Sequence, residues 1–153
     1  MATQIERASQ RLYREDFYAW SRQQADLLRD GRFSELDLSR LIEEVEDLGE
    51  NLYRSVRSRV RAIVEHLLKL EHSPASEPKR AWRETIRTQR ADLDEDLTPA
   101  LRPRIEAGLA RSYAKARRDA AAALRDYGEH TAADVLPQTC PYTLDQINSD
   151  WLP

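Results

Sequence analysis

The chain has 153 residues, of which 33% are charged, with one cysteine, four glycines and a net charge of −3 at neutral pH. That length is enough for one domain, and the lone cysteine excludes a disulfide framework. No apolar run is long enough to cross a membrane, and the first residues lack the apolar stretch of a secretory signal. We therefore expect a cytoplasmic protein without a membrane partner. Scarce glycines and few β-branched residues argue against a β-sheet and predict an all-α fold.

Residues 1–12 are polar and show no clear period, so we predict a frayed N-terminus there. Residues 13–153 are expected to form a single helical domain. Its first helix is predicted over 16–30, where apolar side chains recur at helical spacing. Gly31 follows directly, at the position where glycine commonly ends a helix.

The second predicted helix is very long. Apolar residues recur at steps of three and four from 38 to 72, after Asp37 as the expected N-cap. Gly49 lies inside this run and is about 1 kcal/mol less favourable in a helix than alanine. The sequence therefore leaves undecided whether the helix bends or breaks at Gly49. The segment 73–78 contains two prolines and is predicted to be a loop.

Two further main helices are predicted over 79–97 and 103–126, and little regular structure is expected over 127–141. The sequence from Thr143 to Gln146 has the form of a capping box, which predicts a short last helix from there to about residue 149. The expected architecture is an antiparallel helical bundle of four main helices, one of them very long, with a short C-terminal helix.

Charges occur in blocks along the second and third helices. The middle of the second helix is basic and the end of the third is acidic. Antiparallel pairing about the 73–78 loop places these blocks side by side, which favours this register although each exposed pair contributes only about 0.2–1 kcal/mol. The facing pairs predicted in this way are Arg59 with Asp92, Arg57 with Asp94 and Arg54 with Asp96.

Two charged sets remain without a partner in this register, and we interpret them as candidate interaction residues. The first is a basic stripe on the third predicted helix, which consists of Arg80, Arg83, Arg87 and Arg90. The second is an acidic block on the second predicted helix, which consists of Glu43, Glu46, Asp47 and Glu50. The basic stripe of one copy can pair with the acidic block of a second copy, and we therefore predict a homodimer. An alternative is that the basic stripe binds nucleic acid weakly, although the net negative charge argues against this.

His66 is the candidate residue for chemistry, and it has two interpretations. The plainer one is a partly buried histidine in a polar centre with Trp82, which the hairpin register brings close. The other uses the spacing of Arg61 and Arg59 to His66, which resembles the R-x4–6-H motif of the higher-eukaryote-and-prokaryote nucleotide-binding ribonucleases. That resemblance implies phosphate stabilisation by arginine and acid–base cleavage by histidine. The sequence contains no convincing metal site, and no cofactor is expected.

Five segments, in this order and spacing, resemble the bacterial domain-of-unknown-function family twenty-nine (DUF29). They are DFYAW at 16–20, LIEEVEDLG at 41–49, EHLLKL at 65–70, WRETI at 82–86 and CPYTL at 140–144. The resemblance covers residues 12–153 and implies a bacterial, almost entirely α-helical protein. It implies no activity and no catalytic residues.

The sequence therefore favours a protein–protein interaction or regulatory module over an enzyme. A metal-independent, toxin-like ribonuclease and a weak nucleic-acid binder are the alternatives.

Overall fold

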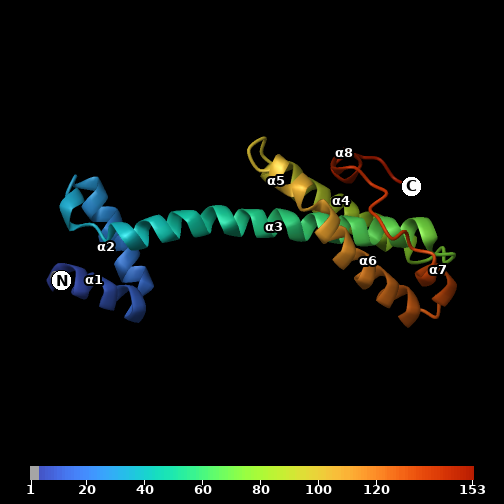
Figure 1. The fold of residues 1–153 in the computed structure, drawn as a ribbon, viewed down its shortest axis with the longest axis horizontal. Helices are drawn as coiled ribbons and strands as arrows, with labels where there is room; N and C mark the ends of the chain where they lie inside the picture. Colours follow the sequence, from blue (N-terminus) through green and yellow to red (C-terminus); the bar gives the residue numbers. More distant parts are fainter. Residues whose placement is uncertain (1–3) are drawn as a thin grey trace. The chain divides into compact units, whose positions relative to one another are not determined.

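The computed structural model describes residues 4–153, with side chains from residue 7 on, and these residues contain helices and no β-strand. The predicted all-α helical bundle is confirmed. The chain divides into two compact units, residues 1–50 and 51–153, and each is described separately. Helix α3 (Leu38–His72) belongs to both and is continuous through Gly49 (Figure 1). The structure thus answers the open question of a break at Gly49.

The N-terminal unit begins with a helix where a frayed end was predicted. Helix α1 spans Gln4–Glu15, and residues 1–3 lie outside the described residues. Whether this helical end frays stays a prediction. Helix α2 (Phe17–Arg29) and a short 3₁₀ turn, η1 (Phe33–Glu35), precede α3. Whether residues 13–153 behave as a single domain stays a prediction.

Helix α2 begins and ends where the sequence indicated. The Asp16 carboxylate accepts a hydrogen bond from the backbone N–H of Ala19 at 2.9 Å, which caps the N-terminus. At the other end Gly31 adopts φ 69°, a left-handed conformation that suits glycine. The N–H of Arg32 then reaches the carbonyl of Leu27 at 2.9 Å, which completes a Schellman motif and satisfies a terminal carbonyl.

An aromatic cluster and a buried polar network hold the N-terminal unit together. The rings of Tyr13 and Trp20 meet edge to face at 4.9 Å. In the network, Ser9 donates a hydrogen bond to the Asp37 carboxylate at 3.1 Å, and the Asp37 backbone N–H donates to the Gln24 side chain at 2.8 Å. Asp37 and Gln24 are 9% and 1% exposed, so these bonds pair the Asp37 carboxylate and the Gln24 amide oxygen where little water reaches them.

The C-terminal unit contains the rest of α3 and five further helices. These are α4 (Lys79–Asp96), α5 (Arg102–Ala107), α6 (Leu109–Asp126), α7 (His130–Asp134) and α8 (Leu144–Ile147). The helix predicted over 103–126 is divided into α5 and α6, and α7 lies in the segment expected to have little structure. The capping box before α8 is confirmed, because the Thr143 side chain accepts from the N–H of Gln146 and the Gln146 side chain accepts from the N–H of Thr143.

The division between α5 and α6 occurs at Gly108. A Cβ atom at this position would lie 3.3 Å from the Tyr53 hydroxyl oxygen, closer than an ordinary van der Waals contact. Glycine therefore lets α3 approach the junction of α5 and α6. Periodicity did not indicate this break, because residues on both sides continue the same apolar pattern.

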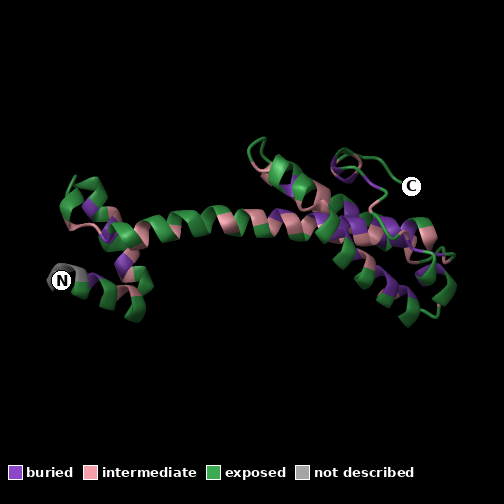
Figure 2. Ribbon diagram, viewed as in Figure 1, coloured by how far each residue is buried: buried purple, intermediate pink, exposed green. Residues whose placement is uncertain are grey.

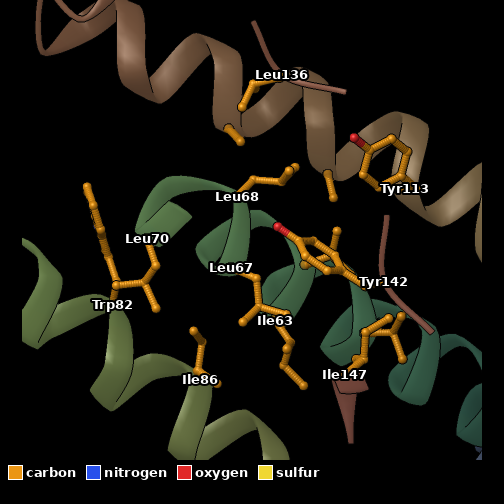
Figure 3. Packing of buried hydrophobic residues seen from close by; sticks show 14 of the residues in the cluster. Ile63, Leu67, Leu68, Leu70, Trp82, Ile86, Tyr113, Leu136, Tyr142 and Ile147 are labelled. Atoms are coloured by element: carbon orange, nitrogen blue, oxygen red, sulfur yellow. The ribbon is translucent and has the colours of Figure 1, made fainter. Parts of the chain in front are cut away.

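One hydrophobic core fills the C-terminal unit. Residues of α3, α4, α6 and the segment up to α8 meet there, including Leu67, Ile86, Tyr113, Tyr142 and Ile147 (Figure 3). The Tyr142 hydroxyl donates to the Glu71 carboxylate at 2.7 Å, and the Tyr113 hydroxyl donates to the Pro137 carbonyl at 2.6 Å. Each tyrosine thus has a hydrogen-bond acceptor for its hydroxyl group while its ring packs in the core.

The antiparallel pairing of α3 with α4 is supported by the contacts of one arginine. Arg59 forms an ion pair with Asp92 at 3.6 Å, as predicted, and a second with Asp96. The other two predicted pairs do not form. Arg57 lies over the Tyr53 ring, and Arg54 donates to the Asn51 side chain, because both arginines find partners on their own helix that require no reach to α4.

Candidate interaction surface

An apolar stripe lies exposed on the first half of α3. The side chains of Leu38, Ile42, Val45 and Leu48 are 61%, 50%, 65% and 71% exposed, and their spacing places them on one side of the helix. Figure 2 shows this half of α3 as mainly exposed, whereas its second half carries buried core residues. We call these four residues the α3 stripe. Contiguous exposed apolar side chains of this kind are typical of docking surfaces.

The predicted acidic block lies on the same half of α3. Glu43 pairs with Arg40 one turn before it, Glu46 and Asp47 are exposed, and Glu50 is half-buried. Residues 38–50 contain five acidic side chains and one basic side chain. The α3 stripe is therefore bordered by negative charge, which favours a partner with basic residues around its own apolar face.

The basic stripe on α4 is only partly available for a partner. Arg87 pairs with Glu84 of the same helix at 2.8 Å, while Arg80 and Arg83 are exposed. Arg83, Arg87 and Arg90 line a hollow of about 640 Å³, which also contains the carboxylates of Asp94 and Asp150. Because both signs of charge line this hollow, it lacks the uniformly basic character of a phosphate-binding surface.

Arg90 has a structural contact that the sequence analysis missed. Its guanidinium donates hydrogen bonds to the carbonyl oxygens of Ile147, Gln146 and Trp151 at 2.9, 2.9 and 2.7 Å. These acceptors belong to the C-terminal segment, so Arg90 connects α4 to that segment. The Nε and Nη2 donors of Arg90 are thus engaged within the chain, and its role as an interaction residue stays a prediction.

His66 lies in a polar centre with Lys69 between it and Trp82. The His66 Nδ1 atom is 2.8 Å from the carbonyl oxygen of Ala62, which only accepts, so Nδ1 carries the proton. Its Nε2 atom is 3.4 Å from the Lys69 ammonium. Burial, helped by the positive charge of Lys69, lowers the pKa of His66 below its ordinary value. The imidazole is therefore neutral at pH 7, with both nitrogens engaged.

Lys69 is the member of this centre that the sequence analysis did not identify. Its side chain is 7% exposed, and its ammonium lies 2.8 Å from the Glu65 carboxylate and 5.5 Å from the centroid of the Trp82 ring. A buried charge needs such partners. A signal was present in the sequence: Lys69 interrupts an apolar run and has glutamate four residues before it, at ion-pair spacing on a helix.

The two arginines proposed to act with His66 have different surroundings. Arg59 is neutralised by Asp92 and Asp96, as described above. Arg61 lies in a hollow that α3 lines together with α6. Arg61 and His66 are five positions apart on α3, so their side chains leave the helix in different directions. The ribonuclease alternative stays a prediction. The contacts of Arg59 and Arg61 do not place either guanidinium beside the His66 imidazole, where a substrate phosphate would have to bind.

Across residues 4–153 no group of three or more histidine, cysteine, aspartate or glutamate side chains is arranged to hold a metal ion. None of the helices described for the chain combines the length and the apolar character that a membrane crossing requires. Cys140 is a free, half-buried thiol, and burial raises its pKa, which disfavours the nucleophilic thiolate.

Comparison with known proteins identifies one relationship. A family model described as "Domain of unknown function DUF29" matches residues 12–152. No curated protein and no solved structure matches the chain. No ligand or activity therefore comes to this chain from a relative.

Proposed function

The chain belongs to the family described as domain of unknown function DUF29, and we propose that it is a protein–protein interaction or regulatory module whose docking surface is the α3 stripe. The observation that carries this proposal is the exposure of four large apolar side chains along one side of α3. Burying such a side chain fully against a partner contributes about 1.5–3 kcal/mol.

The partner that fits this surface is a basic amphipathic helix of another protein. An apolar helix face docks against another at spacings of three and four residues, as in helix-in-groove recognition. The excess of acidic side chains over residues 38–50 selects lysine or arginine around the partner's apolar face. Self-pairing through the same surface would place two acidic blocks together, which costs free energy.

The homodimer predicted from the sequence uses another contact, between the α4 arginines and the acidic block of a second copy. Arg87 and Arg90 have partners within their own chain, so Arg80 and Arg83 are the cations left for such a contact. The homodimer stays a prediction that sedimentation of the whole chain tests, and a separate basic partner is the proposal we develop.

A designed peptide tests the proposal. The probe is a fluorescent amphipathic helix with leucines at i, i+3, i+4 and i+7 and lysines at the bordering positions, here called the lysine peptide, and its counterpart has glutamates instead. Fluorescence anisotropy measures the affinity of each for the whole chain and for the variant Leu48→Asp. Val135→Asp is the matched control, since Val135 is 60% exposed on the C-terminal unit and gains the same charge.

Apolar docking and simple charge attraction predict opposite effects of Leu48→Asp. Apolar docking predicts an affinity for the lysine peptide at least about tenfold weaker, or about 1.4 kcal/mol, with Val135→Asp unchanged. Charge attraction alone predicts equal or tighter binding, because the variant adds a negative charge, and that result would overturn the proposal. Equal affinity for the glutamate peptide would also overturn it.

A further inference from the structure

A second surface, on the C-terminal unit, is uniformly basic. A hollow of about 200 Å³ is lined by residues of α3 and α6, which are Arg57, Arg61, Arg111, Ser112, Lys115 and Arg118. Five of these six side chains are cationic, and no carboxylate is among them. We call it the basic hollow. It is distinct from the α3 stripe, which lies on the N-terminal unit.

Helical spacing explains how the cations gather. Arg57 and Arg61 are four residues apart on α3, and Arg111, Lys115 and Arg118 recur at i, i+4 and i+7 on α6, so each set shares one helix surface. The neighbouring positions Ala116 and Ala120 are buried in the core that α3 and α6 share. Small side chains at this contact let the two basic surfaces border one hollow.

The positive charge of the basic hollow is largely uncompensated. Among the described residues, Arg61, Arg111 and Arg118 have no side-chain ion pair or hydrogen bond. Lys115 pairs with Asp119 on the same helix at 3.0 Å, and Arg57 lies 5.4 Å from the centroid of the Tyr53 ring. Like charges held close together repel, so an anion in the hollow would remove an unfavourable interaction.

The chemistry of the donors indicates which anion fits. The guanidinium group donates in a planar fork that matches the oxygens of phosphate, and several arginines together suit adjacent phosphoryl groups. The hollow is smaller than the roughly 300–1,000 Å³ of pockets that enclose drug-sized ligands. No aromatic or large apolar side chain lines it, so it offers no surface on which a base would stack.

We propose that the basic hollow binds two adjacent phosphoryl groups, either as inorganic diphosphate or as the diphosphate of a small molecule whose remainder stays outside. This site is independent of the proposed docking of a basic helix, because it uses other residues, the opposite charge and the other unit of the chain. It also differs from the basic stripe on α4 that the sequence suggested for nucleic acid.

Isothermal titration calorimetry of the whole chain at low ionic strength tests this proposal, since salt screens exposed charges. The titrants are inorganic diphosphate, orthophosphate, ADP and a single-stranded RNA. The test variant is Arg61→Gln/Arg118→Gln, and the matched control is Arg80→Gln/Arg83→Gln, which removes the same charge from exposed positions of α4. Circular dichroism establishes that each variant keeps the helical content of the wild type.

The expected result is that diphosphate binds the wild type more tightly than orthophosphate does, with affinity at least about tenfold weaker for Arg61→Gln/Arg118→Gln and nearly unchanged for the control. ADP that binds like diphosphate supports a small-molecule source, and ADP that binds far more weakly supports the inorganic ion. Absence of binding by diphosphate and ADP at millimolar concentration would overturn the proposal. So would equal weakening in both double variants, or RNA binding through the hollow without diphosphate binding.

Discussion

Arg90 joins α4 to the C-terminal segment, and Arg90→Ala measures what that connection contributes to stability. Two of its three hydrogen bonds, to the carbonyls of Ile147 and Gln146, are partly buried, and the third, to Trp151, is exposed. A partly buried bond from a charged donor contributes roughly 1–2 kcal/mol, and an exposed one much less. Loss of all three should therefore lower the free energy of unfolding by about 2–4 kcal/mol.

Urea unfolding followed by circular dichroism measures this change, with Arg87→Ala as the matched control. Arg87 lies nearly one turn away and pairs with Glu84, and these side chains are 74% and 66% exposed, so its loss should change stability by no more than about 0.5 kcal/mol. Arg90→Lys keeps the charge but loses the planar fork, and should fall between the two. Equal effects of Arg90→Ala and Arg87→Ala would refute the role given to Arg90.

Two titrations test the buried groups of the C-terminal unit. Burial lowers the pKa of His66 below 6.5. The neutral imidazole therefore contributes stability that is complete above that pH and is lost as the pH falls below it. Urea unfolding from about pH 8 to about pH 5 should show a shallower decline in the free energy of unfolding for His66→Gln than for the wild type. An identical decline would contradict this. Burial raises the pKa of Tyr113 from 10.0 to about 12, so stability should be lost as the pH rises above 10, and the ultraviolet difference titration between the wild type and Tyr113→Phe should show ionisation near 12 rather than near 10.

The elements that the sequence predicted best have signals within a few residues of one another. The bounds of α3, the stop at Gly31 and the capping box before α8 all depend on local spacing and side-chain type, and all are present. Helix α1 was not predicted, although Ile5, Ala8 and Leu12 recur at helical spacing, because these few apolar residues stand among many polar and charged ones. Most of the predicted helix bounds lie within a residue or two of the observed ones.

The features that the sequence did not reveal depend on distant parts of the chain. Arg90 donates to carbonyls 56 to 61 residues away, and backbone acceptors leave no trace in side-chain patterns. The α3 stripe shows a related difficulty, because periodicity indicates which apolar residues share a face but not whether another element covers that face. Leu48 and Val60 belong to the same apolar pattern, yet they are 71% and 0% exposed.

Amide hydrogen exchange with and without the lysine peptide tests the docking surface of the α3 stripe most directly. The exposed half of α3 exchanges through local opening, which a bound helix suppresses. We predict slower exchange over residues 38–50 when the peptide is bound, and no such slowing for Leu48→Asp at the same peptide concentration. Slowing confined to residues 51–153, or none at a saturating concentration of peptide, would contradict the proposal that the α3 stripe is a docking surface.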